Sequence, residues 1–269
     1  NKIGIQTNFY KEEKLKNVNQ PIRLHQVVIE GSEIAIAKES PSDNKSIAVL
    51  PFVNMSNDEE QEYFSDGISE EIINMLAQVP KLKVIGRTSS FAFKGKNIDL
   101  KIIGEQLKVS YLLEGSVRKA GNKLRITAQL IKVEDGFHLY SEKFDRELED
   151  IFAIQDEISE KILNAIKIKL FSSDKDVVFK KYTDNIEAYE LYLNGRFHYN
   201  NQYSKEGFLK AIDYFKKAIE IEPDYSIAYA EMGYCYMTLA YWNWLPVDQS
   251  LPLARTAVEK SIVLDDQID

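Results

Sequence analysis

The segment that begins at Ser46 constrains the fold of this chain more than any other. Residues 46–51 form a short apolar run that ends in proline, which is the pattern of a buried strand. The acidic stretch from Asn54 to Asp66 predicts a loop. From Gly67 onward apolar residues recur at helical spacing, so we predict a helix that begins there and carries Ile68, Ile72, Met75, Leu76 and Val79.

Strands and helices continue to alternate as far as Leu170. The predicted elements are a strand at 82–87, a helix at 97–109, strands at 111–119, 123–134 and 137–145, and a helix at 150–170. The last three strands are separated by Ala120-Gly121-Asn122 and Asp135-Gly136, which are tight-turn signals. The order β-α-β-α-β-β-β-α predicts an α+β domain, with a mixed sheet covered by helices.

Five sequence blocks in this region carry a resemblance to a known domain. They are AVLPF (48–52), YFSDGISEEI (63–72), RTSSFAFKG (87–95), LLEGSVRKAGNKLRITAQLI (112–131) and DGFHLYSEKFDRELEDIFAIQDEIS (135–159). In this order they resemble the domain shared by the amino-terminal part of the translocation protein TolB and the flagellar protein FlgO. Bacterial nucleotide cyclases and tetratricopeptide regulators also carry it. The resemblance implies an α+β domain at 46–171 and a regulatory or recognition role, and it implies no reaction.

Composition argues against several classes of protein. The formal net charge is −8 and no dense basic patch is present, so a nucleic-acid partner is not expected. Cys235 is the sole cysteine, which excludes an intramolecular disulfide, and its helical surroundings favour a packed core residue over a reactive thiol. No apolar run approaches the roughly 18 residues of a membrane helix. Because the chain begins at Asn1 rather than Met and shows no signal peptide, we expect a fragment of a longer bacterial protein. Since no membrane span separates its parts, we expect that protein to be cytoplasmic.

Residues 14–28, KLKNVNQPIRLHQVV, resemble the closing strands of class III adenylate and guanylate cyclase catalytic domains, and Pro21 would begin the last strand. The resemblance implies that 1–31 is the incomplete tail of such a domain, followed by a polar linker at 32–45. The family's metal-binding aspartates and transition-state asparagine and arginine lie upstream of this tail. We therefore predict no catalytic, metal or cofactor-binding residue in this chain. Mg²⁺ or Mn²⁺ with ATP or GTP is expected only if the parent protein is a cyclase.

The region 185–269, after a linker at 172–184, predicts helical repeats. Ala211, Phe215, Ala218 and Pro223 have the spacing of the second helix of a tetratricopeptide repeat. The preceding helix would contain Ala188, Leu191, Tyr192, Gly195 and Tyr199, with an insertion at 200–207. The spacing recurs at Ala254, Val258, Ser261 and Asp266, after a second insertion around Trp242, Trp244 and Pro246. Two repeats are fewer than a solenoid usually needs, so we expect the array to continue beyond Asp269.

Aromatic residues in the repeats suggest a surface for a protein or peptide partner. Tyr199, Trp242 and Trp244 lie at or near the predicted insertions rather than at repeat core positions. Exposed aromatic side chains are effective contact anchors. We therefore predict these three residues as the partner-binding site, although most aromatics of the region should be core.

Several other polar patterns are explained better by solvation or salt bridges than by catalysis or metal binding. The acidic run 57–60, with Glu62 and Asp66, lacks the spacing and glycine of an EF-hand, and a solvated loop is favoured over a Ca²⁺ site. Salt bridges explain Glu142 and Asp145 better than a catalytic carboxylate pair. The remaining candidates lack the partners that metal, phosphate or nucleophile chemistry requires: His25, His138 and His198, Lys94-Gly95-Lys96, and Ser89 with Ser90.

Two function classes stay open. The preferred one is a non-catalytic regulatory and protein-interaction segment of a bacterial signalling protein, which couples an output domain to a tetratricopeptide docking or sensing array. The alternative is part of a class III adenylate or guanylate cyclase, which makes cyclic nucleotide from ATP or GTP and whose active site lies upstream. Because cyclases of this class work as dimers, that resemblance also implies a homodimer of the parent.

Overall fold

The computed structural model describes residues 6–13, 22–28, 45–80, 82–165 and 182–265. It separates into two compact units, Asn1–Asp43 and Asn44–Asp269. In the first unit, strands β1 (Gln6–Glu13) and β2 (Ile22–Val28) form an antiparallel hairpin with a register shift between Phe9 and Lys11. Pro21 and positions 32–44 of the predicted linker lie outside the described residues.

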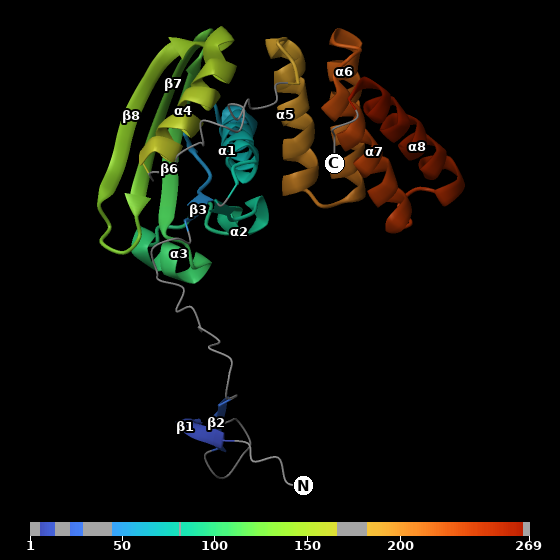
Figure 1. The fold of residues 1–269 in the computed structure, drawn as a ribbon. Helices are drawn as coiled ribbons and strands as arrows, with labels where there is room; N and C mark the ends of the chain where they lie inside the picture. Colours follow the sequence, from blue (N-terminus) through green and yellow to red (C-terminus); the bar gives the residue numbers. More distant parts are fainter. Residues whose placement is uncertain (1–5, 14–21, 29–44, 81, 166–181, 266–269) are drawn as a thin grey trace. The chain divides into compact units, whose positions relative to one another are not determined.

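A mixed six-stranded sheet is the framework of the second unit (Figure 1). The strand order is β5-β3-β6-β7-β8, and β4 pairs with β6 beside β3. Strand β3 runs parallel to β5 and β6, whereas β6, β7 and β8 form an antiparallel meander. The strands are β3 (Ser46–Val49), β4 (Val53–Asn54), β5 (Lys83–Val84), β6 (Tyr111–Ala120), β7 (Lys123–Lys132) and β8 (His138–Glu147). The predicted α+β class with a mixed sheet is confirmed.

The meander follows the sequence signals closely. Gly121 and Gly136 have φ angles of +58° and +74°, a region that glycine adopts without steric cost, and both lie in the predicted turns. On β7, Leu124, Ile126 and Leu130 are buried, as the near-alternation of apolar residues predicts. Sequence alternation therefore identifies the buried face of the sheet correctly.

Four helices accompany the sheet, namely α1 (Glu62–Ala77), α2 (Arg87–Phe91), α3 (Leu100–Leu107) and α4 (Ile151–Ala165). Phe64, Ile72 and Ile158 of α1 and α4 belong to the main hydrophobic core, together with Ile47 of β3. A smaller cluster joins Ala48 to residues of α3 and β6. Because neighbouring strand residues point to opposite faces, the sheet has a core on both sides.

Several predicted boundaries are wrong. Helix α1 begins at Glu62, before Gly67, and a 3₁₀ turn precedes it (η1, Glu59–Gln61). The Asp58 side chain accepts a hydrogen bond of 2.9 Å from the Glu60 backbone N–H, so part of the predicted loop is ordered by a cap. Residue Arg87 starts α2 instead of ending a strand. Positions 166–170 of the last predicted helix lie outside the described residues.

The helical array consists of α5 (Ile186–Asn201), α6 (Lys205–Ile221), α7 (Ser226–Tyr241) and α8 (Val247–Leu264), which lie side by side in Figure 1. Phe215 is buried, and a Cβ on Gly195 would lie 2.5 Å from its ring, so glycine permits the close approach of α5 and α6. Helix α6 ends at Ile221, before Pro223, as predicted. The insertion predicted at 200–207 is wrong, because α5 continues to Asn201 and α6 starts at Lys205. Asp266 lies outside the described residues.

Candidate functional site

Helix α1 carries acidic side chains at four-residue intervals, which places them on one face of the helix. Lys94, just after α2, lies 2.8 Å from a carboxylate oxygen of Glu62 and 2.5 Å from one of Asp66. Arg87 of α2 pairs with Glu70, whose side chain is 4% exposed. Buried carboxylates need such partners, since an unpaired buried charge is strongly unfavourable. The α2 region therefore neutralises the acidic face of α1.

Arg196 of α5 reaches the same carboxylates from the helical array. Its guanidinium lies 2.8 Å from Glu70, 3.4 Å from Glu71 and 3.7 Å from Glu231 of α7, and the side chain is 14% exposed. It also donates a hydrogen bond of 3.1 Å to the Tyr192 hydroxyl. One cation thus contacts α1, α5 and α7. We call Glu70, Glu71, Arg87, Arg196 and Glu231 the ionic junction.

Close packing surrounds the ionic junction. A Cβ on Gly67 would lie 2.7 Å from both methyl carbons of Leu193, so glycine inside α1 allows α5 to approach. From α4, the Gln155 side chain donates a hydrogen bond of 2.8 Å to the Tyr189 hydroxyl, and Phe152 packs edge-on against the same ring at 4.9 Å. The sheet and the array are therefore joined through α1 and α4.

The junction holds more negative than positive groups, because two guanidinium groups face three carboxylates. Burial raises the pKa of Glu71 to about 7, an effect that Arg196 opposes and that Glu70 and Glu231 reinforce. Burial likewise raises the pKa of Asp66 to about 6, although Lys94 lies beside it. Protonation of Glu71 brings the charges of the junction into balance. The arrangement can therefore hold two parts of the protein together in a charge-dependent way.

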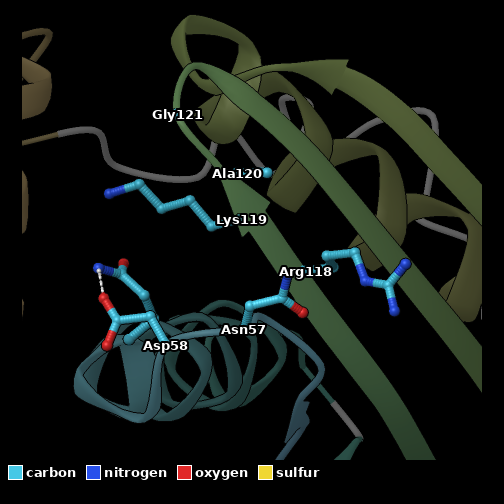
Figure 2. A pocket seen from close by; sticks show the side chains of 7 residues that line it. Asn57, Asp58, Arg118, Lys119, Ala120 and Gly121 are labelled. Carbon is cyan, nitrogen blue, oxygen red and sulfur yellow. Dashed lines mark hydrogen bonds between the residues drawn. The ribbon is translucent and has the colours of Figure 1, made fainter.

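The surface has two hollows of interest, of which the first borders the junction. One is a small cleft of about 60 Å³ between α1, α4, α5 and the start of α7, and Glu71, Tyr189 and Tyr225 are among its lining residues. The other is a broad surface depression of about 710 Å³ beside the β6–β7 turn (Figure 2).

Figure 2 shows the side chains of Arg118 and Lys119 pointing in different directions, as expected for neighbours on a strand. Both cations of the depression are engaged within the protein. Lys119 pairs with Glu190 of α5, and Arg118 donates to the Met55 carbonyl oxygen at 2.9 Å. The dashed line in Figure 2 joins the side chains of Gln61 and Asp58, 3.3 Å apart. This depression therefore presents less free charge than its sequence suggests.

The three predicted partner-binding residues belong to one aromatic cluster, in which Tyr199 and Trp244 both contact the Phe208 ring, but they differ in exposure. Trp242 and Trp244 stack at the α7–α8 turn with ring centroids 6.2 Å apart, and Trp242 is 50% exposed. Tyr199 is 8% exposed and its hydroxyl donates to Glu231 at 2.8 Å, so its predicted place near a surface insertion is wrong. Because α5 continues past Tyr199, this side chain supports the ionic junction from within the array.

The structure also places the other candidate residues. Glu142 pairs with Lys161 and Asp145 with Arg125, which agrees with the predicted salt bridges. Cys235 is fully buried and burial raises the pKa of its thiol, as expected for a core residue. Within the described part of the chain, His, Cys, Asp and Glu side chains form no group suited to a metal ion. No described helix has the length and hydropathy to cross a bilayer.

Sequence reasoning missed the central residues of the junction, Glu70, Glu71 and Arg196. The available signal was weak. Glu70 and Glu71 stand next to each other in a buried helix, and Arg196 is a cation among the aromatic residues of α5. Neither observation indicates that these residues meet in space.

Comparisons with known proteins relate parts of this chain to a regulator domain and to a cyclase-named protein. A sequence profile described as "HilA/YgeH-like transcriptional regulator, second domain" matches residues 43–161. A protein of Rhizobium meliloti (strain 1021) described as "Putative adenylate cyclase 3" is 41% identical over 232 residues, which cover 83% of this chain and 39% of the relative. The chain thus spans about two fifths of that relative's length.

Solved structures match parts of the chain at low sequence identity. TolB from Acinetobacter baumannii is 15% identical with a TM-score of 0.33, over 45% of this chain and 28% of that protein. The LpoB C-terminal domain from Salmonella enterica is 16% identical with a TM-score of 0.33, over 40% of this chain and 87% of that domain. Lipoprotein GNA1162 from Neisseria meningitidis is 15% identical with a TM-score of 0.35, over 45% of this chain and 99% of that protein. Scores this low establish nothing about function.

Proposed function

We propose that this chain is a non-catalytic regulatory segment of a bacterial signalling protein. In this proposal the helical array binds a protein or peptide, and the α+β domain passes the event to an output domain. The ionic junction is the observation that carries the proposal. Arg196 contacts carboxylates of both α1 and α7, so a movement of the array changes the surroundings of α1.

The array itself supports the assignment as tetratricopeptide repeats. Gly195 packs against Phe215 between α5 and α6, and Pro223 follows the end of α6. Trp242 and Trp244 are the proposed partner contacts, since they stack at one end of the array, where Trp242 is exposed and Trp244 is partly buried beneath it. Tyr199 takes a supporting role through its hydrogen bond to Glu231.

A class III nucleotide cyclase is the output domain that we favour. The name of the Rhizobium meliloti relative and the cyclase-like tail at 1–31 support it. The active site, with its Mg²⁺ or Mn²⁺ and ATP or GTP, would then lie outside these residues, in a cytoplasmic protein that dimerises. A second candidate is a DNA-binding output domain, which the match to a transcriptional regulator domain favours.

Hydrogen exchange tests the coupling without knowledge of the partner. Phe215→Ala opens a cavity in the array core, and large-to-small changes of this kind cost about 3–5 kcal/mol. If the junction couples the two parts, amide exchange in α1 rises along with exchange in α5 and α6. Leu253→Ala on an exposed position of α8 is the matched control, and it should leave α1 unchanged. Unaltered protection of α1 in the Phe215→Ala variant would contradict the proposal.

A direct assay tests the proposal that this chain is non-catalytic. Incubation with ATP or GTP and Mn²⁺ should yield no cyclic nucleotide, because no residue of the chain matches the cyclase metal-binding or transition-state positions. Measurable turnover would show that the chain contains catalytic residues that the present assignment lacks.

A further inference from the structure

Strand β8 forms the outer edge of the sheet (Figure 1). It pairs with β7 along one side, and no described strand pairs with its other side. The strand is ten residues long, whereas β5 at the opposite edge has two. A long open edge presents backbone N–H and C=O groups that can pair with another strand.

The charges along β8 complement those of a second copy of the same strand. In antiparallel pairing centred on Phe144, Glu142 lies opposite Arg146 of the second copy and Lys143 lies opposite Asp145 of the second copy. Two-fold symmetry repeats each of these contacts. Opposite charges in directly facing positions stabilise a strand pair, and like charges destabilise it.

The neighbouring two-fold registers lack this complementarity. Pairing centred on Lys143 or on Asp145 places that residue opposite its own copy, so two like charges face each other. Pairing centred on Glu142 or Arg146 likewise places that charged residue opposite its own copy. Of the registers centred on these five residues, the Phe144 register alone matches opposite charges without a like pair. Charged residues can also protect an exposed strand edge from pairing. That role does not require positive and negative residues to follow one another in this particular order.

The strand is rigid and its charged groups are accessible. Phe144 is buried in the main core and fixes the strand against α4. The side chains of Lys143 and Asp145 are 56% and 48% exposed, and they contact each other at 3.2 Å. Asp145 also pairs with Arg125, and Glu142 with Lys161, and these pairs are about half and two fifths exposed. Exposed ion pairs of this kind contribute little stability, so sharing or exchanging them for pairs between copies costs little.

We propose that β8 is a dimerisation edge, at which two copies of this chain pair antiparallel about Phe144 and form one continuous sheet. This inference goes beyond the proposed regulatory function and does not depend on it. Its partner is a second copy of the chain, because the matching charges lie on the same strand.

Sedimentation velocity of the full chain over a range of concentrations tests the proposal. We expect a dimer that weakens at high salt, since its exposed charges are screened. Lys143→Glu and Asp145→Lys each place two like-charge pairs across the interface, and each should weaken the dimer at least about tenfold. The double variant Lys143→Glu/Asp145→Lys restores opposite charges and should recover association. Lys216→Glu makes the same charge change on an exposed position of α6 and serves as the control.

Disulfide trapping tests the register separately. Mixing a Lys143→Cys chain with an Asp145→Cys chain should give a linked dimer, whereas Lys143→Cys alone should not. The native Cys235 is buried and does not compete. A chain that stays monomeric, or a dimer indifferent to the single charge reversals, would overturn the proposal. Failure of the double variant to recover, or equal linking of Lys143→Cys with itself, would refute the Phe144 register.

Discussion

Replacing Arg196 by methionine tests the ionic junction most directly. The change removes the cation that joins α1 to α5 and α7 and keeps an unbranched apolar side chain in its place. Arg87 still neutralises Glu70, but Glu71 and Glu231 lose their guanidinium partner. The variant thus leaves two carboxylates close together in a largely buried site.

The size of the effect follows from the burial of these groups. Breaking a buried ion pair by removing one partner costs about 3–5 kcal/mol. We expect the lower end, about 3 kcal/mol, because Glu71 and Glu231 are each about a fifth exposed and can recruit water, and because Glu71, whose pKa is already raised to about 7, takes up a proton when Arg196 is removed. For a unit of this size a change of 1 kcal/mol moves the Tm by about 2–4 °C, so the Tm should fall by about 6–12 °C.

Thermal and urea unfolding followed by circular dichroism at neutral pH would measure this loss. Arg255→Met is the matched control, because Arg255 is 80% exposed and pairs with Glu259 on the same turn of α8. Its Tm should match that of the unmodified chain. Equal Tm values for Arg196→Met and Arg255→Met would refute the view that the junction holds the array to the sheet.

Three further variants test other parts of the same region. Burial raises the pKa of Glu71 from 4.5 to about 7, so the folded state binds a proton that the unfolded state releases, and stability should rise as the pH falls from about 7 towards 4.5. Urea unfolding across this range should show that slope, and Glu71→Gln should reduce it, most clearly between pH 7 and 6, because Asp66, with its pKa raised to about 6, contributes only at lower pH. Gly67→Ala should cost about 1–3 kcal/mol in urea unfolding, because the new methyl group would overlap Leu193, whereas Gly86→Ala points into open space and should change stability by less than about 1 kcal/mol. Tyr199→Phe should lower the free energy of unfolding by about 1.5–3 kcal/mol, the value of a hydrogen bond to a charged group, and an unchanged urea midpoint would exclude that role.

The sheet could be predicted from the sequence because its signals are local. Alternation on β7 and the turn glycines Gly121 and Gly136 depend on residues within one hairpin. Helix ends were harder to predict. Gly67 marks the start of α1 in the sequence pattern, yet it lies inside the helix, where contact with Leu193 of α5 requires a residue without a side chain. Tertiary contact explains this glycine, and propensity does not.

The ionic junction could not be predicted from the chain alone. Glu71 and Arg196 are 125 positions apart, and no local pattern brings them together. The error on Tyr199 has a related origin, since an expected insertion implied exposure where α5 in fact continues. Contacts between α1 and the array decide both cases, and these exist only in the folded protein.

The parallel pairing of β3 with β6 has a consequence for the order in which the sheet can form during synthesis. Strand β3 pairs with β6 in a register that joins Ile47 to Tyr111, which are 64 positions apart (111 − 47). At roughly 5–20 residues per second, a ribosome needs about 3–13 s to make the intervening chain. During that time β3 has only the two-residue strand β5 beside it, which pairs Ile47 with Val84, and Val49, which is fully buried in the finished fold, has no strand partner. We expect β3 to be the first segment of this domain that needs a chaperone, and the β6–β8 meander to need one least, because its strands pair as soon as each hairpin is complete.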